Sequence, residues 1–510
     1  MMDRRDFMAM AAGTLVACGM RVHGEGAAAA TLRIPAEARG PQMAEDFIGL
    51  SYEVQQLADP EFFSARNTGL IGQMRGLAAR GVLRLGGNTS EFAYWKPVEG
   101  GPEPAHPQTR VVEGEPAPHY YAVRPEAVRN LAEFLDATGW SCIYGINLGT
   151  NTPERAAEEA AFAARALGGR LEYFQVGNEA DLYDHHLRDP KTWSAKAYLE
   201  EWLAMTRAIS ARVPGARFGM PDIATKMEWL TELAELWAAV KDAPRVTTVT
   251  HHYYFGGPAT NPEVNIGRLL GAAAMERVAQ MAETANAAAA RMGARVRMTE
   301  GNTCYRGGKP GVSDVFAAAL WSADYALQLA SRGYTGVNLH GGTGKSVANS
   351  VGGALPGDAI LSAQGKTAAE IATHPHPFYT PIGTFGGEYK LEPVGYGLKF
   401  AGAWSGARLF ETDWAEALAT SGVNATAYAA EMKDGKRSVV VLNKDAGRDL
   451  AVQVQFGGAE GQRVRVERLA AQGLESRAAH LTREAQGAEV RNGSVEANVP
   501  RASGLRLTLA

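Results

Sequence analysis

The chain has 510 residues, 46% of them hydrophobic and 21% charged, an ordinary globular composition that argues against disorder as the main state. This length is sufficient for a barrel and a smaller second domain. The formal net charge is −4, so there is no basic excess, and nucleic acid or a long sulfated polyanion is not the expected partner.

Residues 1–30 have the layout of an export signal. The pair Arg4-Arg5 precedes an apolar segment that runs to Cys18, as in a twin-arginine signal, and an ordinary Sec signal is the alternative. The run Leu15-Val16-Ala17-Cys18 is similar to a bacterial lipobox, in which Cys18 would be lipidated, whereas cleavage near residues 27–30 is the competing outcome. No stretch approaches the roughly 18 apolar residues of a membrane span. We therefore expect a bacterial protein that is exported to the periplasm or lipid-anchored on the cell envelope.

Eight strand-like runs then alternate with Ala-rich helical stretches. This alternation predicts an α/β fold, a (β/α)8 TIM barrel, for residues 41–408. The alternative is an open doubly wound sheet, which would need a Gly-rich phosphate turn after the first strand, and Gly49-Leu50-Ser51-Tyr52-Glu53 offers none. The predicted strands are Phe47–Tyr52, Val82–Leu85, Cys142–Asn147, Leu171–Val176, Arg217–Met220, Val246–Thr250, Arg295–Thr299 and Gly336–Leu339.

After about Phe410 the pattern changes to short alternating runs, separated by turn-like sequences such as Lys433-Asp434-Gly435-Lys436. This change predicts a C-terminal antiparallel β-sandwich domain at residues 409–510. The extended, apolar segment within residues 31–40 is a candidate edge strand of that sandwich.

Two long stretches within the barrel, Val98–Pro118 and Gly341–Gly365, are rich in Gly, Ala and Pro and have little periodicity. They follow the second and eighth predicted strands, on the side where a substrate would lie. Long loops in a compact domain are usually functional or disordered. We therefore expect these loops to decide whether a substrate cleft is blocked at one end.

Two of the predicted strands lead into a carboxylate, at Gly177-Asn178-Glu179 and at Glu300-Gly301-Asn302. Parallel barrel strands open at one carboxyl-terminal mouth, where the chemistry of such barrels takes place. A lone Glu at a strand end is more often a solvated rim residue. Two at these positions form the pair that glycoside hydrolysis needs: one carboxyl protonates the leaving oxygen, and the other attacks the anomeric carbon or directs water to it. The Asn178 side chain can donate to a neighbouring sugar hydroxyl.

These motifs resemble clan A glycoside hydrolases, and specifically glycoside hydrolase family 79, the β-glucuronidase and heparanase group. The resemblance covers the chain from about Phe47 to Phe400, and the C-terminal sandwich fits in kind. Its most specific parts are Val176-Gly177-Asn178-Glu179, His251-His252-Tyr253-Tyr254, the run Thr299-Glu300-Gly301-Asn302-Thr303-Cys304-Tyr305-Arg306-Gly307-Gly308, Gly311-Val312-Ser313-Asp314 and Ala318-Ala319-Leu320-Trp321.

The resemblance implies that Glu179 is the acid/base and Glu300 the nucleophile of a retaining reaction. It also implies that Tyr305 and the backbone around Gly307 hold a uronate carboxylate, with Tyr379 as a second contact. Tyrosine hydroxyls and backbone amides can bind a carboxylate without placing a full cation beside the reacting centre.

The family also implies that Tyr254, or its neighbour Tyr253, hydrogen-bonds Glu300 and keeps it ionised. The chain departs from the clan at Ala180, where many members have Pro, a change expected to loosen the turn while retaining the carboxyl. The segment Arg84–Ser90 is expected either to supply polar groups to the sugar or to be a plain turn. The remaining expected substrate contacts are Glu53, Asn88 and Asn178.

Three runs could be taken for metal ligands: His251-His252, Asp184-His185-His186 and His374-Pro375-His376. None has the spacing of a closed metal site and no Cys joins them, so hydrogen-bonded or surface histidines are preferred. The run Gly341–Ser346 is similar to a phosphate loop but lacks its first Gly, and no helix is expected to follow it. We expect no metal, no cofactor and no disulfide framework.

The sequence thus predicts a retaining exo-β-glucuronidase that removes terminal glucuronate, or its 4-O-methyl form, from an oligosaccharide or glycoconjugate. A heparanase-like endo-hydrolase is the enzymatic alternative, and the missing basic surplus favours exo action. A non-catalytic carbohydrate-binding barrel is the alternative outside the enzymes.

Overall fold

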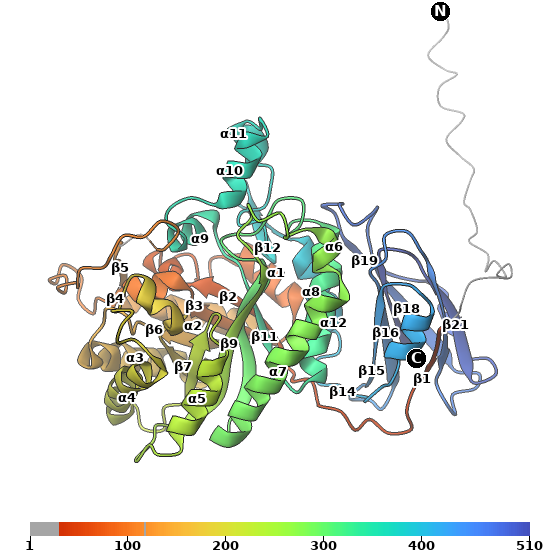
Figure 1. The fold of residues 1–510 in the computed structure, drawn as a ribbon, viewed down its shortest axis with the longest axis horizontal. Coiled ribbons are helices and arrows are strands. Elements are labelled where there is room, and N and C mark those ends of the chain that lie inside the picture. Colours follow the sequence, from red (N-terminus) through yellow and green to blue (C-terminus); the bar gives the residue numbers. More distant parts are fainter. Residues whose placement is uncertain (1–29, 117–118) are drawn as a thin grey trace, which may run out of the picture.

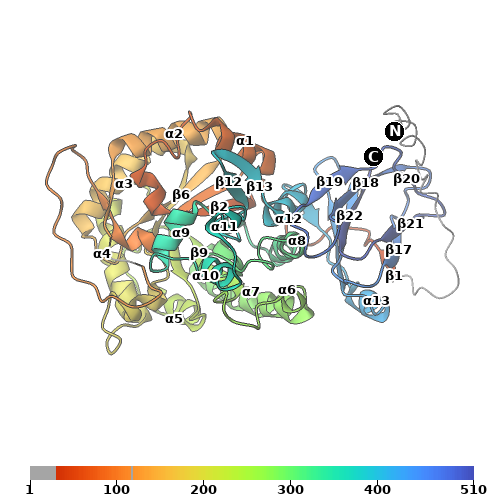
Figure 2. The same cartoon turned by 90° about the horizontal axis from the view of Figure 1, so that it is seen from above.

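The computed structural model of the chain describes residues 30–116 and 119–510 (Figure 1). The export signal predicted for residues 1–30, with Cys18, lies outside these ranges apart from Ala30. Within the described ranges, no helix is both long enough and apolar enough to cross a membrane. A helix-covered barrel and a smaller β-domain lie side by side (Figures 1 and 2).

Eight parallel strands close into a barrel, which confirms the predicted fold class. All six residues of the first barrel strand are buried, because barrel strands are covered by helices outside and by side chains inside. The barrel strands, in chain order, are β2 (Ile48–Glu53), β3 (Val82–Gly86), β6 (Ser141–Ile146), β7 (Leu171–Val176), β8 (Phe218–Ile223), β9 (Val246–Gly256), β10 (Arg295–Cys304) and β11 (Val337–His340).

The outer helices form because the sequence combines a capping residue with an apolar stripe. In α3 (Pro153–Leu167), Thr152 caps the first turn, and Ala156, Ala160, Ala163 and Leu167 recur on one buried face. Figure 2 shows such helices arranged around the barrel. The others are α1 (Thr68–Leu77), α2 (Pro125–Thr138), α4 (Ala195–Arg212), α5 (Glu228–Trp237), α7 (Ala272–Met292) and α8 (Phe316–Ser331).

Strands β9 and β10 run further than their predicted ends at Thr250 and Thr299. Their pairing shifts register between Met298 and Glu300, which leaves Thr299 as an extra residue. In a regular strand, neighbouring side chains point to opposite faces. Because of the extra residue, the Thr299 hydroxyl and the Glu300 carboxylate both contact polar groups inside the barrel.

The prediction that Gly341–Gly365 is a loop with no following helix is wrong. Thr343 accepts a hydrogen bond from the Ser346 amide and begins α9 (Gly344–Ser350), and Pro356 begins α10 (Pro356–Ala363). These helices, with the four-residue α11 (Ala368–Ile371), stand above the barrel mouth in Figure 1. Residues 98–116 contain no helix or strand.

The C-terminal domain packs two sheets against one shared apolar core. One sheet has the order β1-β17-β21, in which β1 (Ala30–Arg33) pairs in parallel with β17 (Leu450–Gln455), and β21 (Ser494–Val499) is antiparallel. The second sheet has the order β14-β15-β16-β22-β18-β19 and is antiparallel throughout. Its strands are β14 (Arg408–Leu409), β15 (Ala425–Glu431), β16 (Arg437–Asn443), β18 (Arg463–Ala470), β19 (His480–Arg483) and β22 (Ser503–Leu509), with β20 (Ala488–Glu489) paired to β18.

The two domains meet at a buried ion pair. Lys444 donates to Asp324 of α8 at 2.6 Å, and both side chains are almost fully buried. The other oxygen of Asp324 accepts from Thr426 at 2.8 Å and from Tyr428 at 2.6 Å. Helix α12 (Pro393–Gly402) packs along α8 beside this junction, so the sandwich is fixed against one side of the barrel.

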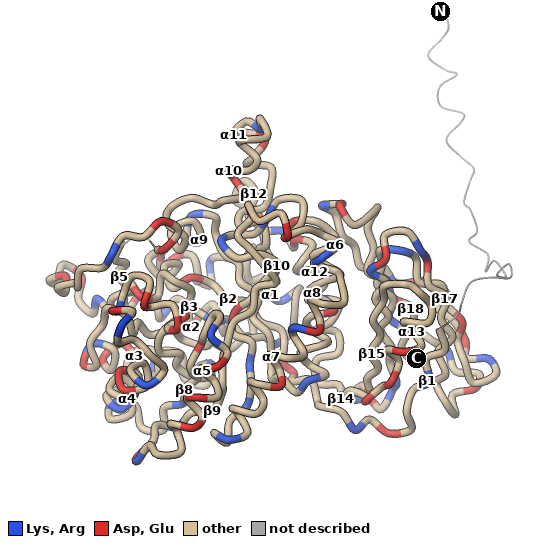
Figure 3. The backbone as a smooth tube through the Cα atoms, in the orientation of Figure 1, with Lys and Arg blue, Asp and Glu red and all other residues tan. Residues whose placement is uncertain are grey.

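Charged residues of both signs are interspersed over the two domains, as Figure 3 shows. This distribution agrees with the small net charge of −4. The two cysteines within the described chain, Cys142 in β6 and Cys304 in β10, are buried and free.

Candidate active site

A cleft of about 1260 Å³ opens at the carboxyl ends of the barrel strands. Its lining includes both glutamates from the strand-end motifs. Seven of the predicted site residues line it together: Glu53, Asn88, Glu179, Tyr254, Glu300, Tyr305 and Tyr379. The barrel therefore brings most of the predicted residues to one place.

Glu179 lies in the turn that follows β7. Its φ is 48°, in the left-handed region that disfavours side chains, and its amide donates to the Asp222 carbonyl at 2.9 Å. The preceding amide, of Asn178, donates to the buried carboxylate of Glu91 at 2.8 Å. These bonds hold the turn next to Ala180, where the sequence predicted a looser one.

Glu300 is surrounded by donors from four strands. Arg84 of β3 donates to its Oε2, and Tyr254 of β9 donates to its Oε1 at 2.9 Å. His340 at the end of β11 lies 3.3 Å away, and the Ser51 hydroxyl of β2 lies 3.4 Å away. Burial alone would raise the pKa of Glu300, but His340, His252 and Arg84 hold it well below its usual range.

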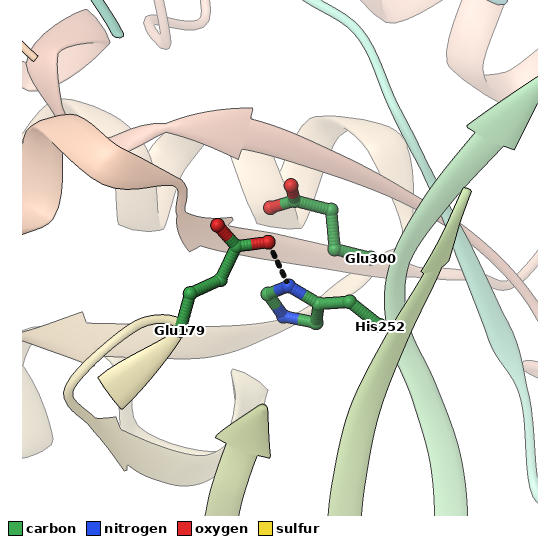
Figure 4. Close-up of side chains that lie close together, drawn as sticks. All are labelled: Glu179, His252 and Glu300. Carbon is green, nitrogen blue, oxygen red and sulfur yellow. Dashed lines mark hydrogen bonds and ion pairs between the residues drawn. The ribbon is translucent and has the colours of Figure 1, made fainter. Parts of the chain in front are cut away.

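Glu179 has a different environment, drawn in Figure 4. Its Oε1 accepts from His252 Nδ1 at 2.9 Å. Burial raises the pKa of Glu179, and the nearby Glu300 charge adds to this, against the opposing effect of His252. The two carboxyls therefore differ in acidity: Glu300 is suited to be ionised and Glu179 to carry a proton.

Glu179, His252 and Glu300 each offer one atom within 4.8 Å of the others, which is close enough for a shared divalent ion. Their charges argue against such a site. Asp222 and Glu300 outweigh burial and raise the pKa of His252 to about 10, so the ring is a cation at neutral pH. A protonated ring has no free ligand nitrogen, and Arg84 already occupies Glu300.

Arg84 joins the two sides of the site and is fully buried. Its NH1 contacts Glu300, and its NH2 contacts both Asp222 and the Asn178 side-chain oxygen. Burial disfavours its charge, but Asp222 and Glu300 raise the pKa of the guanidinium nonetheless. Arg84 is therefore a permanent cation shared by two carboxylates.

The three predicted polar sugar contacts lie together beside Arg84. Asn178 donates to the Asn88 side chain at 3.0 Å, and Asn88 donates to the Ser350 carbonyl of α9 at 3.2 Å. One Glu53 oxygen accepts from the amide and hydroxyl of Thr89, and the other lies 3.2 Å from His340. The cleft therefore has a floor of hydrogen-bonded polar groups at this end.

A cluster of three tyrosines covers the opposite side of Glu300. The Tyr254 ring lies 6.1 Å from Tyr379 and 6.4 Å from Tyr305, which is 38% exposed. The Tyr305 hydroxyl makes no hydrogen bond to the described part of the chain. Gly307 lies against Leu355, with a φ of 89°, and is not among the residues that line the cleft.

Sequence reasoning missed the parts played by Arg84, Asp222, His252 and His340. His252 stood in a run that was interpreted as hydrogen-bonded histidines, and it is hydrogen-bonded, but inside the site. The role of His252 could have been predicted from the sequence, because His252 and Tyr254 are two residues apart on one strand and so point to the same side. Asp222 gave none, since it lies beyond the predicted end of its strand at Met220.

No protein-family model matches the chain. A Beta-glucuronidase of Aspergillus niger is 28% identical over 311 residues, which cover 56% of this chain and 55% of the relative. A Beta-glucuronidase of Neurospora crassa is 27% identical over 317 residues, covering 56% of this chain and 54% of the relative. The chain spans about half the length of the curated relatives it matches.

Solved structures with the same architecture include a 4-O-alpha-L-rhamnosyl-beta-D-glucuronidase from Fusarium oxysporum 12S, solved as a Rha-GlcA complex. Its TM-score is 0.69 at 18% identity, covering 94% of this chain and 100% of that chain. A GH51 arabinofuranosidase from Xanthomonas axonopodis pv. citri has a TM-score of 0.62 at 15% identity, covering 94% and 99%. These likenesses show that the chain shares the fold of these structures.

Proposed function

We propose that the protein is a retaining exo-β-glucuronidase of the family 79 kind, which removes terminal β-linked glucuronate or its 4-O-methyl form from glycans. The observation that carries the proposal is the pair Glu179 and Glu300, whose pKa values are shifted in opposite directions in one cleft. The two fungal relatives named Beta-glucuronidase support the choice of sugar.

The spacing of the two carboxyls supports retention. One oxygen of Glu179 and one of Glu300 lie within 4.8 Å of each other. Retaining glycosidases hold their two carboxyl groups about 5–5.5 Å apart, whereas inverting ones leave about 6.5–9.5 Å for a water molecule. Direct attack by Glu300 is therefore favoured over attack by water.

In the first step, Glu300 attacks the anomeric carbon while Glu179 gives its proton to the departing oxygen, and the sugar becomes an ester of Glu300. In the second step, the Glu179 carboxylate takes a proton from water, which attacks the same carbon and releases Glu300. Tyr254 and Arg84 stabilise the Glu300 carboxylate before attack and after release.

Uronate selectivity is assigned to the tyrosine cluster. The Tyr305 hydroxyl has no hydrogen-bond partner among the described residues and can donate to a ligand, and Tyr379 lines the same cleft. Hydrogen bonds of this type to a charged acceptor contribute about 1.5–3 kcal/mol each. Gly307 is not among the residues that line the cleft, so a direct contact of its amide with the substrate has less support than contacts of the two hydroxyls.

Exo action is supported by the loop of residues 98–116, whose Gly114 and Glu115 line the cleft. Glu115 lines the cleft and lies 3.2 Å from His185 and 3.9 Å from Arg306. Arg110 donates to two backbone carbonyls of the segment after β7, and the His106 ring stacks on Tyr120 at 3.5 Å. A loop anchored at three places would end the cleft as a pocket, whereas an endo-hydrolase needs both ends open.

The experiment that tests the function is a panel of aryl glycosides. We expect turnover of an aryl β-glucuronide and little of the galactoside, xyloside or arabinofuranoside. Activity on the neutral sugars alone would contradict the uronate assignment, and saturable binding without release would indicate a binding module instead. Internal cleavage of a glucuronate polymer would favour the heparanase-like alternative.

Export by the twin-arginine route is a separate proposal, supported by Arg4-Arg5 and tested by localisation of an Arg4→Lys, Arg5→Lys variant.

A further inference from the structure

Asp222, near the end of β8, contacts the residues that surround the two candidate catalytic glutamates. Its backbone oxygen accepts from the Glu179 amide at 2.9 Å. Its Oδ2 contacts Arg84, and its Oδ1 accepts from Thr299, the residue before Glu300. The same Oδ1 lies 3.2 Å from His252 Nε2. One buried carboxylate thus touches the neighbours of both candidate catalytic glutamates.

The backbone of Asp222 is strained, as is common for residues at functional sites. Its φ is 63° and that of Glu179 is 48°, so both residues occupy the left-handed region that side chains rarely adopt. Such strain persists only where the surroundings impose it, and it gathers at functional sites. The hydrogen bond between these two backbones ties the strained turns to each other.

We propose that Asp222 is a positioning residue that acts through His252, holding the ring as a cation that donates to Glu179 and so supports proton transfer by the acid/base. The inference rests on the proposed hydrolysis. Asp222 is fully buried and does not line the cleft, so its role is not a direct contact with the substrate.

The charges around Asp222 determine the protonation of this ring. Burial would raise the pKa of Asp222, but Arg84, His252 and the Thr299 hydroxyl lower it to about 2, so it is an anion throughout the working range. The anion faces Nε2 of His252 and leaves Nδ1–H for Glu179. The other titratable groups that sense Asp222 are Tyr173 of β7, Tyr198 of α4 and His251 of β9.

The role follows from the two chemical steps. When Glu179 loses its proton to the leaving oxygen, the carboxylate that forms lies 2.9 Å from the His252 cation and is stabilised by it. When water attacks, the same carboxylate takes up a proton and the ring stays charged. Without the Asp222 anion, the buried ring would favour its neutral form, and the Glu179 carboxylate would lose its partner.

The test compares leaving groups in Asp222→Asn. A methyl β-glucuronide needs a proton at the departing oxygen, whereas a dinitrophenyl β-glucuronide does not. General acid catalysis contributes about 10²–10⁴-fold, so kcat/KM on the methyl substrate should fall at least about tenfold more than on the dinitrophenyl substrate. His252→Gln should show the same pattern, and the double variant should lose less than the product of the two single losses.

A second measurement does not depend on turnover. In ¹⁵N-histidine NMR at pH 7, the His252 signal should be that of a doubly protonated ring in the wild type and of a neutral ring in Asp222→Asn. The control is Asp324→Asn, which removes another buried, ion-paired aspartate and should leave both the leaving-group dependence and the His252 signal unchanged.

Equal losses on both substrates in Asp222→Asn and His252→Gln would overturn the inference, and so would a neutral His252 in the wild type. If Asp222→Asn does not fold, His252→Gln and the wild-type spectrum still decide. A wild type that hydrolyses no aryl glucuronide would instead contradict the proposed function, while the NMR result would continue to test the Asp222–His252 pair.

Discussion

Two buried clusters of charge in this protein differ in how their charges are matched. At the domain junction, Lys444 pairs with Asp324, its one ion-pair partner in the described chain, and the second oxygen of Asp324 accepts from two hydroxyl donors. At the barrel mouth, Arg84 is shared between Asp222 and Glu300. The Lys444–Asp324 pair, whose groups all have partners, holds the two domains together. At the barrel mouth, one cation shared between carboxylates leaves those carboxylates with different affinities for a proton.

The same contrast appears between the two sides of the mouth. Glu300 contacts the cations Arg84 and His340 and also senses His252, while the cation that contacts Glu179 is His252. The difference in surroundings, and not in residue type, separates their pKa values. Substitutions at the barrel mouth should therefore act mainly on catalysis, and substitutions at the domain junction mainly on stability.

The largest effect is expected for Glu300→Gln at the barrel mouth. Without a carboxylate no covalent intermediate can form, so turnover of every glucuronide should be abolished. Stopped assays on an aryl glucuronide and on an activated fluoride measure this. Because the change is buried, folding is checked by thermal unfolding, and substantial turnover by a folded variant would contradict the role of nucleophile.

Glu179→Ala should be next, with a loss that depends on the leaving group. Glycan and alkyl substrates should slow by about 10²–10⁴-fold, the contribution of general acid catalysis, while the dinitrophenyl glucuronide retains activity. The control is Glu172→Gln, a carboxyl at the far end of β7, which should leave both substrates unaffected. Equal losses on both substrates in Glu179→Ala would refute the acid/base assignment.

Asp324→Asn tests the other cluster. It leaves the buried Lys444 without its partner, which should destabilise the fold by about 3–5 kcal/mol while the folded enzyme keeps its kcat/KM. Denaturant unfolding measures the free energy, and Asp434→Asn, at an exposed pair with Lys436, is the control that should change little. A stability loss no larger than that of the exposed control would show that the junction does not depend on this pair.

Tyr305→Phe should affect one substrate only. Loss of a hydrogen bond to the substrate carboxylate costs about 1.5–3 kcal/mol, or roughly 10- to 150-fold in kcat/KM on a glucuronide. A β-glucoside has no carboxylate and should barely change. If both substrates slowed by the same factor, the hydroxyl would serve the reacting centre instead.

The most gradual effect is expected at alkaline pH. The folded-state pKa values of His252 and His340 are raised to about 10 and 9, so their contribution to stability is complete below about pH 6.5 and is lost as pH rises. Each group should cost about 1.4 kcal/mol per pH unit over this range. Denaturant unfolding between pH 6.5 and 9.5 measures the slope, which should be shallower in His340→Gln. A flat profile in the wild type would mean that neither histidine is charged.

Much of the architecture was predictable because it depends on local pattern. The period of apolar residues and the turns between them identified the eight barrel strands and a separate C-terminal β-domain. The short helices α9 and α10 were not predicted, because this Gly-, Ala- and Pro-rich stretch has little periodicity, although Thr343 and Pro356 serve as helix starts.

By itself the sequence determined the barrel and the placement of Glu179 and Glu300 at its mouth, since a carboxylate at a strand end stays at that end however the strands pack. Only the tertiary structure decided what surrounds each one. Arg84, Asp222 and His252 come from three strands, and Arg84 and Asp222 alone are 138 residues apart in sequence, so they meet only because the barrel closes. Their pKa shifts arise from distances across that closure, which no local pattern encodes.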